Sequence, residues 1–325
     1  MNAYPLLFEP VLKDYVWGGR NLERLYGRPL PEGITAESWE IAAHEDGTTR
    51  VSNGVYAGKL LTELQAELGL DLIGTKGEWA QARGKFPLLV KLLDAQKSLS
   101  VQVHPDDAYA LEHEGNELGK TEMWVVLHAE PDAAVILGVR QGTTPDLFRQ
   151  AIADNRAEPF LHQIPVVAGD VVCVPAGSLH AILGGLVIAE IQQNSNTTYR
   201  VYDWGRPRPL HVDKALQVIN FEQVEPVLTR PQTHPFAFGI HKATLCHNDY
   251  FITEQIDMAP NTTYTGHCDG SSLEIWGTLT GTATITGNEQ SINLPAIQFT
   301  LLPAHLGTFT ITVAQPTSLL RTYLP

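Results

Sequence analysis

The stretch GDVVCVPAGSLH, residues 169–180, joins a predicted strand to a predicted sharp turn. A Gly-Asp turn pair opens it, and the β-branched run Val171–Val174 that follows predicts a strand. Pro175 and Gly177 predict a reversal of the chain, which lets His180 begin the next strand. The stretch therefore predicts two β-strands around a tight turn, with a histidine where the second strand begins.

Similar short apolar runs, broken by Gly, Pro, Asn and Asp, occur on both sides of this stretch. Strands at this spacing are typical of a barrel or a jelly roll. The predicted strands cover residues 88–93, 99–103, 123–127, 134–137, 171–174, 186–192, 273–276, 282–286, 292–294, 299–302 and 308–313. Helical periodicity is weaker and falls in residues 62–72, 146–155 and 213–219. We therefore expect a mainly β fold with helical decoration.

Length and composition indicate two globular domains. The chain has 325 residues, of which 43% are hydrophobic and 18% charged. A polar stretch over residues 222–235, punctuated by Pro226, Pro231 and Pro235, is typical of a linker. We expect a larger domain over residues 1–235 and a smaller β domain over residues 236–325.

The charge balance limits the classes of partner, and the cysteines indicate the cellular environment. The 22 basic and 36 acidic residues give a formal charge of −14, which disfavours nucleic acid and anionic lipid. Cys173, Cys246 and Cys268 form no CxxC pair, so we expect a reducing, cytoplasmic environment. The sequence predicts no secretion signal and no membrane-spanning segment.

The run SVQVHP, residues 100–105, predicts polar side chains on one face of a strand. Because side chains alternate along a strand, Ser100, Gln102 and His104 point to one face, and the two valines between them point to the other. Imidazole nitrogen and amide oxygen both bind zinc-like metals. Glu122 opens a later apolar run and offers a carboxylate. An isolated acid at such a boundary is usually solvated, so the residues alone give two potential metal ligands, Gln102 and His104, facing one cavity.

The order Gly, Pro, Gly, His in residues 169–180 resembles the second metal motif of the cupin superfamily. In cupins the histidine of this motif faces the barrel interior beside a His-x-His pair and a glutamate. Here Gln102-x-His104 takes the place of the His-x-His pair. Glu122 lies further along the chain than in a minimal cupin.

Further motifs make the chain resemble the short bacterial form of the type I mannose-6-phosphate isomerases. These are Trp17-Gly18-Gly19, Glu37-Ser38-Trp39-Glu40, PLLVKLL from Pro87, SVQVHP from Ser100, KTEMW from Lys120 and TTYRVYDWGRP from Thr197. The resemblance implies a cupin-like jelly-roll barrel and a second, degenerate cupin-like β domain that lacks metal. It also implies an enzyme of mannose metabolism that interconverts D-mannose 6-phosphate and D-fructose 6-phosphate through an enediol.

The resemblance also implies which residues form the site. One Zn²⁺ per chain would be held by Gln102, His104, Glu122 and His180. Arg200 and Lys120 are expected at the reacting end, and Lys91 and Ser100 at the phosphate. Glu190 is the expected proton carrier, with the alternative that it only orients a neighbouring cation. Longer relatives carry a His and an Asp, suspected of opening the sugar ring, where this chain has Gly119 and Asn196.

Two other functions remain open from the sequence. A metal-dependent cupin oxygenase would need histidine-rich ligation with positions open to oxygen, and the neutral Gln102 argues against it. A non-catalytic cupin that binds sugar phosphates would bind without isomerising. For either enzyme or binder the expected partner is a small-molecule sugar phosphate, and the chain is expected to be a monomer or a small homo-oligomer. Trp17, Trp39 and Trp124 are interpreted as packing residues.

Overall fold

The computed structural model describes residues 3–325, which divide into two compact units. One unit combines Leu12–Ser38 with Lys91–Arg230, and we call the two sheets that hold its strands the first barrel. The other combines the residues up to Val11 with Trp39–Val90 and Pro231–Pro325. We call the strands from His234 onward in that unit the second barrel.

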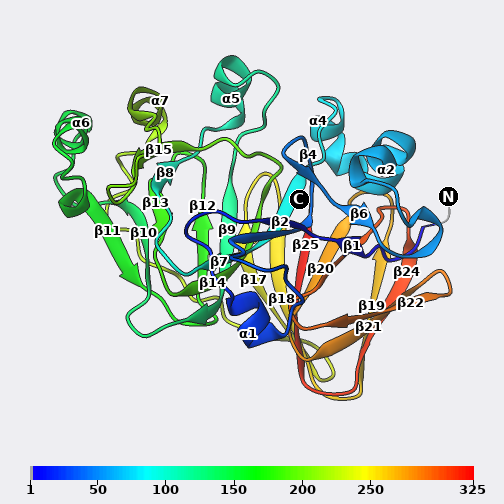
Figure 1. Ribbon diagram of the computed structural model, residues 1–325. Helices are drawn as coiled ribbons and strands as arrows, with labels where there is room; N and C mark the ends of the chain where they lie inside the picture. The colour runs from blue at the N-terminus through cyan, green and yellow to red at the C-terminus, as the bar shows by residue number, and fades with distance from the viewer. Residues whose placement is uncertain (1–2) are drawn as a thin grey trace. The chain divides into compact units, whose positions relative to one another are not determined.

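The first barrel is built from two sheets (Figure 1). The five-stranded sheet has the order β11-β10-β13-β8-β15 and the six-stranded sheet the order β12-β9-β14-β7-β3-β2. The strand bounds are β2 Val11–Lys13, β3 Glu37–Ile41, β7 Leu88–Ala95, β8 Val101–Val103, β9 Glu122–Ala129, β10 Ala134–Val139, β11 Leu161–Pro165, β12 Val171–Val174, β13 His180–Ile182, β14 Leu186–Gln193 and β15 Tyr199–Tyr202.

Each sheet of the first barrel buries an apolar face. Inside the barrel, Trp124 and Ile188 of the six-stranded sheet pack with Leu137 and Ile182 of the five-stranded sheet. On the outer face of the five-stranded sheet, Val101 and other aliphatic side chains pack against two helices. These helices are α6, Pro145–Ala153, and α7, Val212–Val218. The helices therefore cover the outside of the sheet whose inner face carries Gln102.

Local sequence explains where the helices of this unit begin. Helix α6 starts with Pro145 at its first position, and the Thr144 side chain before it accepts a hydrogen bond from Leu147 N. Helix α5, Asp107–His113, starts after Asp106, whose side chain accepts a hydrogen bond from Tyr109 N. The unit also contains α1, Asn21–Tyr26, and the 3₁₀ turn η3, Glu158–Phe160.

The second barrel repeats the two-sheet plan with longer and more regular strands. Its sheets have the orders β16-β17-β18-β25-β20-β23 and β19-β24-β21-β22. The bounds are β16 His234–Ala237, β17 Ile240–His247, β18 Ile252–Met258, β19 Thr262–Cys268, β20 Glu274–Thr280, β21 Thr282–Gly287, β22 Gln290–Pro295, β23 Phe299–Leu302, β24 Gly307–Val313 and β25 Thr317–Tyr323. One core joins the two sheets, with Trp276 and Leu319 from one and Ile285 and Phe309 from the other.

The rest of this unit consists of short elements. They are β1 Phe8–Glu9, β4 Ala43–His44, β5 Gly47–Thr48, β6 Arg50–Val51, η1 Gly54–Tyr56, α2 Leu61–Leu68, α3 Leu70–Ile73, η2 Thr75–Gly77 and α4 Glu78–Gln81. Backbone hydrogen bonds tie α3 to the second barrel, from Ala304 N to Leu72 O and from Leu273 N to Ile73 O. Residues before the linker are therefore integral to this unit.

The mainly β fold with helical decoration is confirmed, and each predicted strand range overlaps an observed strand. Several strands, among them β11, β15, β17, β18, β19 and β25, were not predicted. The strand predicted over residues 171–174 is β12 with the same bounds, and the helix predicted over residues 146–155 is α6. The helix predicted over residues 62–72 is divided into α2 and α3 at Gly69, whose φ is +50°. Helices α1, α4 and α5 were not predicted.

The compact units also bear on the expected domains 1–235 and 236–325. The passage from one unit to the other after Arg230 lies within the predicted linker. Residues 39–90, however, are grouped with the second barrel, although β3 and β7 at the two ends of this range belong to the six-stranded sheet of the first barrel. The assignment of all metal chemistry to the first of two functional domains stays a prediction.

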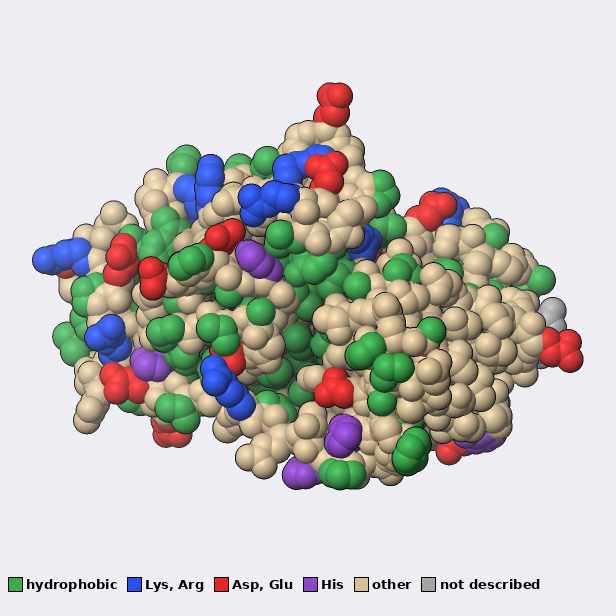
Figure 2. Space-filling model, turned by 90° about the horizontal axis from the view of Figure 1, so that it is seen from below, with side chains coloured by type: hydrophobic (Ala, Val, Ile, Leu, Met, Phe, Trp, Pro, Cys, Tyr) green, Lys and Arg blue, Asp and Glu red, His purple; other side chains and the backbone are tan. Residues whose placement is uncertain are grey.

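The surface in Figure 2 is chemically mixed, and the helices are short. Figure 2 shows acidic, basic and hydrophobic side chains scattered over the face that it draws. Within residues 3–325 every helix is too short or too polar to cross a bilayer.

Candidate active site

A row of three polar side chains crosses the inner face of the five-stranded sheet. In the antiparallel register His180 of β13 is opposite Gln102 of β8, and Gln102 is opposite Arg200 of β15. Residues directly opposite each other in a sheet project to the same side. The strand alternation predicted for Gln102 is thus observed, because Val101 and Val103 lie on the outer face.

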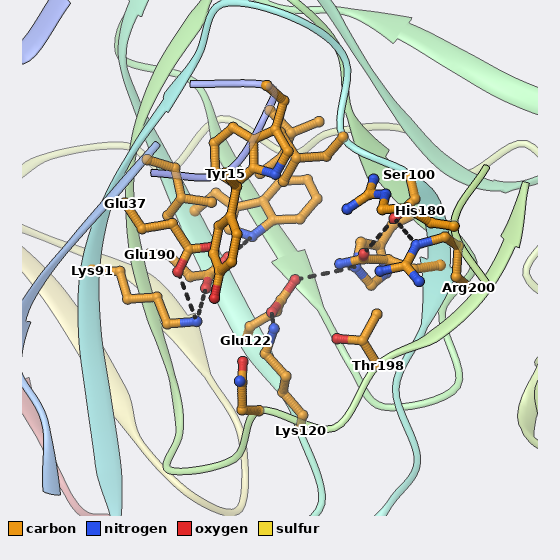
Figure 3. A pocket seen from close by; sticks show the side chains of 18 residues that line it. Tyr15, Glu37, Lys91, Ser100, Lys120, Glu122, His180, Glu190, Thr198 and Arg200 are labelled. Carbon is orange, nitrogen blue, oxygen red and sulfur yellow. Dashed lines mark hydrogen bonds and ion pairs between the residues drawn. The ribbon is translucent and has the colours of Figure 1, made fainter. Parts of the chain in front are cut away.

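A second polar row crosses the facing sheet. On β9, Glu122 is opposite Gln192 of β14, and Trp124 is opposite Glu190. Glu122, Trp124 and Glu190 of this row and the residues of the first row line a cavity of about 300 Å³ (Figure 3). Its lining includes Tyr15, Trp17, Glu37, Lys91, Ser100, Gln102, Lys120, Glu122, Trp124, His180, Glu190, Asn196, Thr198, Arg200 and Arg208.

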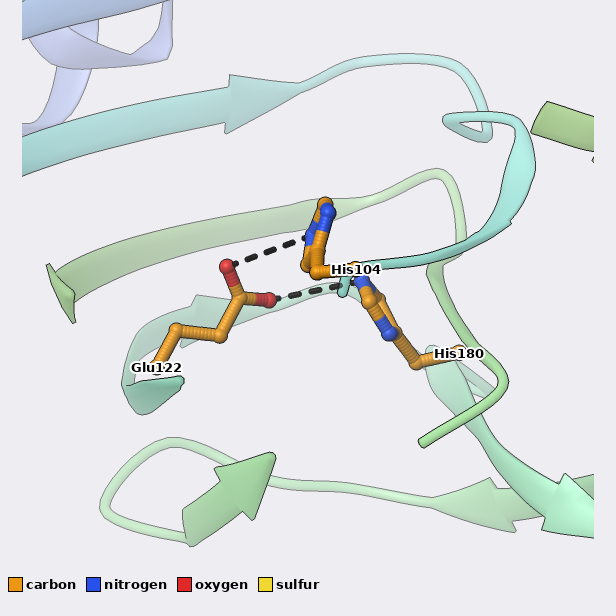
Figure 4. Close-up of side chains that lie close together, drawn as sticks. All are labelled: His104, Glu122 and His180. Atoms are coloured by element: carbon orange, nitrogen blue, oxygen red, sulfur yellow. Dashed lines mark ion pairs between the residues drawn. The ribbon is translucent and has the colours of Figure 1, made fainter. Parts of the chain in front are cut away.

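Three buried side chains converge at one end of this cavity: His104, Glu122 and His180 (Figure 4). The Nε2 atom of His104 lies 3.6 Å from Oε2 of Glu122, and the Nε2 atom of His180 lies 3.4 Å from its Oε1. The two imidazole rings are 4.7 Å apart between centroids. This cluster has the ligand types and the spacing to hold a metal ion.

Backbone carbonyls fix the orientation of both histidines. Nδ1 of His104 donates to Thr197 O over 2.8 Å, and Nδ1 of His180 donates to Ser178 O over 2.9 Å. Burial lowers the pKa of His104 well below its usual value and that of His180 to about 4. Both rings are therefore neutral near pH 7, with the Nε2 lone pair directed toward Glu122, as a metal ligand requires.

Glu122 and Gln102 complete the fit to a cation. Both carboxylate oxygens of Glu122 are buried, and Oε1 accepts no hydrogen bond. A buried carboxylate without full hydrogen bonding is costly unless a cation binds it. The amide of Gln102 lies beside the cluster, with Nε2 3.4 Å from His180 Nε2. A half turn of this amide would direct its oxygen to the same point.

Lys120 supplies positive charge next to the cluster. Its Nζ lies 2.8 Å from Oε2 of Glu122 and 3.1 Å from Nε2 of His104. Burial alone would lower the pKa of Lys120, but the carboxylates of Glu122 and Glu190 outweigh it and leave the pKa raised. Lys120 is therefore a buried cation at the end of the cavity where the three candidate metal ligands converge.

Glu190 lies between two donors on the opposite wall. Nε1 of Trp124 donates to its Oε2 over 3.0 Å, and Nζ of Lys91 lies 3.6 Å from its Oε1. The same Lys91 lies 3.6 Å from Oε2 of Glu37. Burial, and next the charge of Glu122, raise the pKa of Glu190. Lys91 is thus engaged by two carboxylates.

Arg200 and Ser100 lie together. Nε of Arg200 donates to Oγ of Ser100 over 3.1 Å, and one terminal nitrogen donates to Pro209 O over 3.0 Å. Burial, and then the charge of Arg208, lower the pKa of Arg200, although it stays a cation. Arg208 also lines the cavity and pairs with Asp203 over 2.6 Å. This end of the cavity is cationic.

All nine expected site residues lie in or beside one cavity, but their grouping differs from the expected one. Ser100 is beside Arg200, whereas Lys91 is beside Glu190. Sequence reasoning missed Glu37, Trp124 and Arg208 as lining residues. Glu37 and Trp124 lie inside the Glu37–Glu40 and KTEMW motifs, which is the signal that could have found them, whereas Arg208 follows directly after the TTYRVYDWGRP motif.

The two departures from the longer relatives have a structural context. A Cβ at Gly119 would lie 2.4 Å from Asp107 N, so the start of α5 leaves no room for a side chain there. Asn196 lines the cavity.

Comparison with known proteins agrees with this geometry. A family profile for the catalytic domain of type I phosphomannose isomerase matches residues 6–121. The probable mannose-6-phosphate isomerase GmuF of Bacillus subtilis (strain 168) is 37% identical over 316 residues, covering 95% of this chain and 96% of the relative. The chain belongs to the type I mannose-6-phosphate isomerase family.

Two further relatives support the assignment. Mannose-6-phosphate isomerase of Streptococcus mutans is 45% identical over 223 residues, or 67% of this chain and 68% of the relative. The crystal structure of mannose 6-phosphate isomerase from Bacillus subtilis superposes with a TM-score of 0.87 at 33% identity, covering 98% of this chain and 99% of that one. The cupin fold and the isomerase function are thereby confirmed, in preference to an oxygenase or a non-catalytic binder.

Proposed function

We propose that the first barrel interconverts D-mannose 6-phosphate and D-fructose 6-phosphate through an enediol, at one Zn²⁺ held by Gln102, His104, Glu122 and His180. The observation that carries this proposal is the buried Glu122 carboxylate facing two neutral imidazole nitrogens. Two imidazoles, a carboxylate and an amide oxygen suit zinc better than calcium or magnesium. When bound, the ion would supply a Lewis acid for a sugar oxygen.

Glu190 is the proposed base. It would take the proton from carbon 2 of the open-chain aldose, so that the C–H electron pair forms the double bond between carbons 1 and 2. The carbonyl pair moves to oxygen 1, which takes up the proton that oxygen 2 gives up. The O–H pair of oxygen 2 forms the new carbonyl at carbon 2, and the double-bond pair takes the first proton back from Glu190 at carbon 1. The raised pKa of Glu190 suits a base working near neutral pH.

Lys120 is the proposed stabiliser of the negative charge on the enediol oxygens. It is a buried cation within 3.1 Å of His104 and lines the same cavity. A fixed charge in a buried site interacts strongly with charge that develops during the reaction.

The geometry favours exchanging the expected roles of Arg200 and Lys91. Arg200, Arg208 and Ser100 offer charged and hydroxyl donors at one end of the cavity, which suits a phosphate dianion. Lys91 is already engaged by Glu37 and Glu190, so its proposed role is to hold the base. Arg200 is then a phosphate-binding residue rather than part of the reacting end.

A cytoplasmic location is also part of the proposal. The cysteines at positions 173, 246 and 268 are free thiols, which fits a cytoplasmic enzyme acting on a small sugar phosphate. A monomer or a small homo-oligomer is still expected.

The direct test is an assay of fructose 6-phosphate formed from mannose 6-phosphate by zinc-replete protein, with and without a chelator. The proposal expects product only with metal. His104→Ala or His180→Ala should lose metal and turnover together. Product formation that persists in metal-free protein would exclude the zinc mechanism.

A further inference from the structure

We infer that Trp124 is a positioning residue for the Glu190 carboxylate rather than only a packing residue of the barrel core. The inference rests on the proposed role of Glu190 as the base. Trp124 is 1% exposed and lines the cavity, so its indole is held by its surroundings while its N–H faces the site.

A hydrogen bond joins Trp124 to Glu190. Trp124 and Glu190 are opposite each other on β9 and β14, and the indole Nε1–H donates to Oε2 over 3.0 Å. Lys91 approaches the other oxygen, Oε1, at 3.6 Å. One contact leaves a carboxylate free to turn about its last bond, whereas two donors on two oxygens fix its plane.

The Trp124 ring also contacts a second residue of the site. The Trp124 ring meets the His180 ring edge-to-face, with centroids 5.5 Å apart and planes at 67°. One rigid side chain thus contacts both the proposed base and a proposed metal ligand. Proton transfer at carbon 2 needs the base and the metal end at a fixed separation, because small misplacements of reacting groups slow such steps steeply.

Four charged side chains surround Glu190. From β9, β7 and β3 it is faced by Glu122, Lys91 and Glu37, and Lys120 contributes from the segment before β9. Two of these groups repel a carboxylate and two attract it. A neutral indole N–H fixes the position of Glu190 and leaves this balance of charge unchanged. An additional lysine in the same place would add a positive charge and shift the balance.

The second barrel supplies a matched control. Trp276 also lies on a barrel strand two residues after a glutamate, and its Nε1 donates to Oε2 of Glu274 over 2.8 Å. Trp276 is likewise buried, at 0% exposure. Trp276→Phe therefore removes the same kind of bond from the same kind of core, away from the proposed chemistry.

The experiment compares Trp124→Phe, Trp276→Phe and Glu190→Gln as zinc-loaded proteins. It measures kcat, KM, bound metal, and the isotope effect with mannose 6-phosphate deuterated at carbon 2. For Trp124→Phe we expect kcat to fall about ten-fold or more, with KM within about three-fold, because a misplaced base slows the chemical step rather than binding. The isotope effect on kcat should rise, and metal should stay at wild-type content. Trp276→Phe should leave all four unchanged.

The outcomes separate this inference from the proposed function. Wild-type kcat in Trp124→Phe overturns the inference, and so does a loss of metal that parallels the loss of kcat. Activity retained in Glu190→Gln would show that Glu190 is not the base, which would contradict the proposed function. If either phenylalanine variant folds poorly, benzothienylalanine at that position keeps the ring size and replaces only the N–H. At position 124 it should reproduce the fall in kcat, and full activity there would contradict the inference.

Discussion

The two barrels each carry a glutamate two residues before a tryptophan, Glu122-Met-Trp124 in one and Glu274-Ile-Trp276 in the other. In the second barrel Glu274 accepts both the Trp276 N–H, over 2.8 Å, and Nε of Arg321, over 2.9 Å. In the first barrel the tryptophan donates across to Glu190 instead, and Oε1 of Glu122 accepts no hydrogen bond.

The charged side chains inside the second barrel pair with one another. Arg321 pairs with Glu274 and lies 3.3 Å from Glu254, which also receives Lys242 at 2.7 Å and the Tyr323 hydroxyl at 3.2 Å. Two carboxylates and two cations there neutralise one another. The difference indicates that a barrel interior can offer a metal ion a ligand where one carboxylate oxygen of its glutamate accepts no hydrogen bond, as Oε1 of Glu122 does not.

The largest expected effect comes from the two glutamates. Glu122→Gln should lose the bound metal and lower turnover about 10³-fold or more, because several kcal/mol of charge stabilisation depend on the ion. Glu274→Gln should keep both metal and turnover. Metal analysis and initial rates check the pair, and equal losses in both variants would break the comparison.

Next in size is the loss of the cation at the proposed phosphate end. Arg200→Ala should keep one metal per chain and lower kcat/KM about 10²-fold, since charge-assisted bonds to a dianion contribute a few kcal/mol. Arg149→Ala, which removes an exposed arginine of α6, is the control and should be neutral. Unchanged kcat/KM in Arg200→Ala would contradict the phosphate assignment.

The second barrel's arginine should matter for stability alone. Arg321→Ala leaves Glu254 and Glu274 buried with fewer donors, so the free energy of unfolding should fall by about 2–4 kcal/mol. Arg321→Lys keeps the charge but loses the planar fork, and should lose less. Denaturant unfolding measures the stability, and steady-state rates should stay at wild type. A loss of turnover in folded Arg321→Ala would show that the second barrel takes part in catalysis.

The smallest effect is expected at alkaline pH. Burial, and then Glu254, raise the pKa of Tyr323 from 10.0 to about 12. The unfolded chain therefore ionises this tyrosine first, and its contribution to stability is present below pH 10 and lost as the pH rises toward 12. Tyr323→Phe should reduce the alkaline fall in Tm by about 1–2 °C. Parallel Tm–pH curves would contradict this.

Much of the first barrel was predictable because its signals are local. Strand alternation places Gln102 on the inner face, and the Pro175 and Gly177 turn places His180 at a strand start. Helix α5 also had a local signal, the capping side chain of Asp106, which was overlooked.

What could not be predicted depends on pairing between distant residues. Arg200 meets Ser100 across 100 positions, and Trp124 meets Glu190 across 66. Alternation gives the face of each side chain but not its neighbour on the next strand. The grouping of residues 39–90 with the second barrel is likewise set by tertiary hydrogen bonds rather than by composition.

Of the two barrels, only the first is proposed to hold a metal, and isomerisation is proposed to depend on that metal. The most direct measurement is the metal content of purified protein alongside fructose 6-phosphate formation, before chelation, after chelation and after zinc is restored. We expect one ion per chain, loss of activity with the ion, and recovery with zinc. Two ions per chain, or undiminished isomerisation by metal-free protein, would contradict the account.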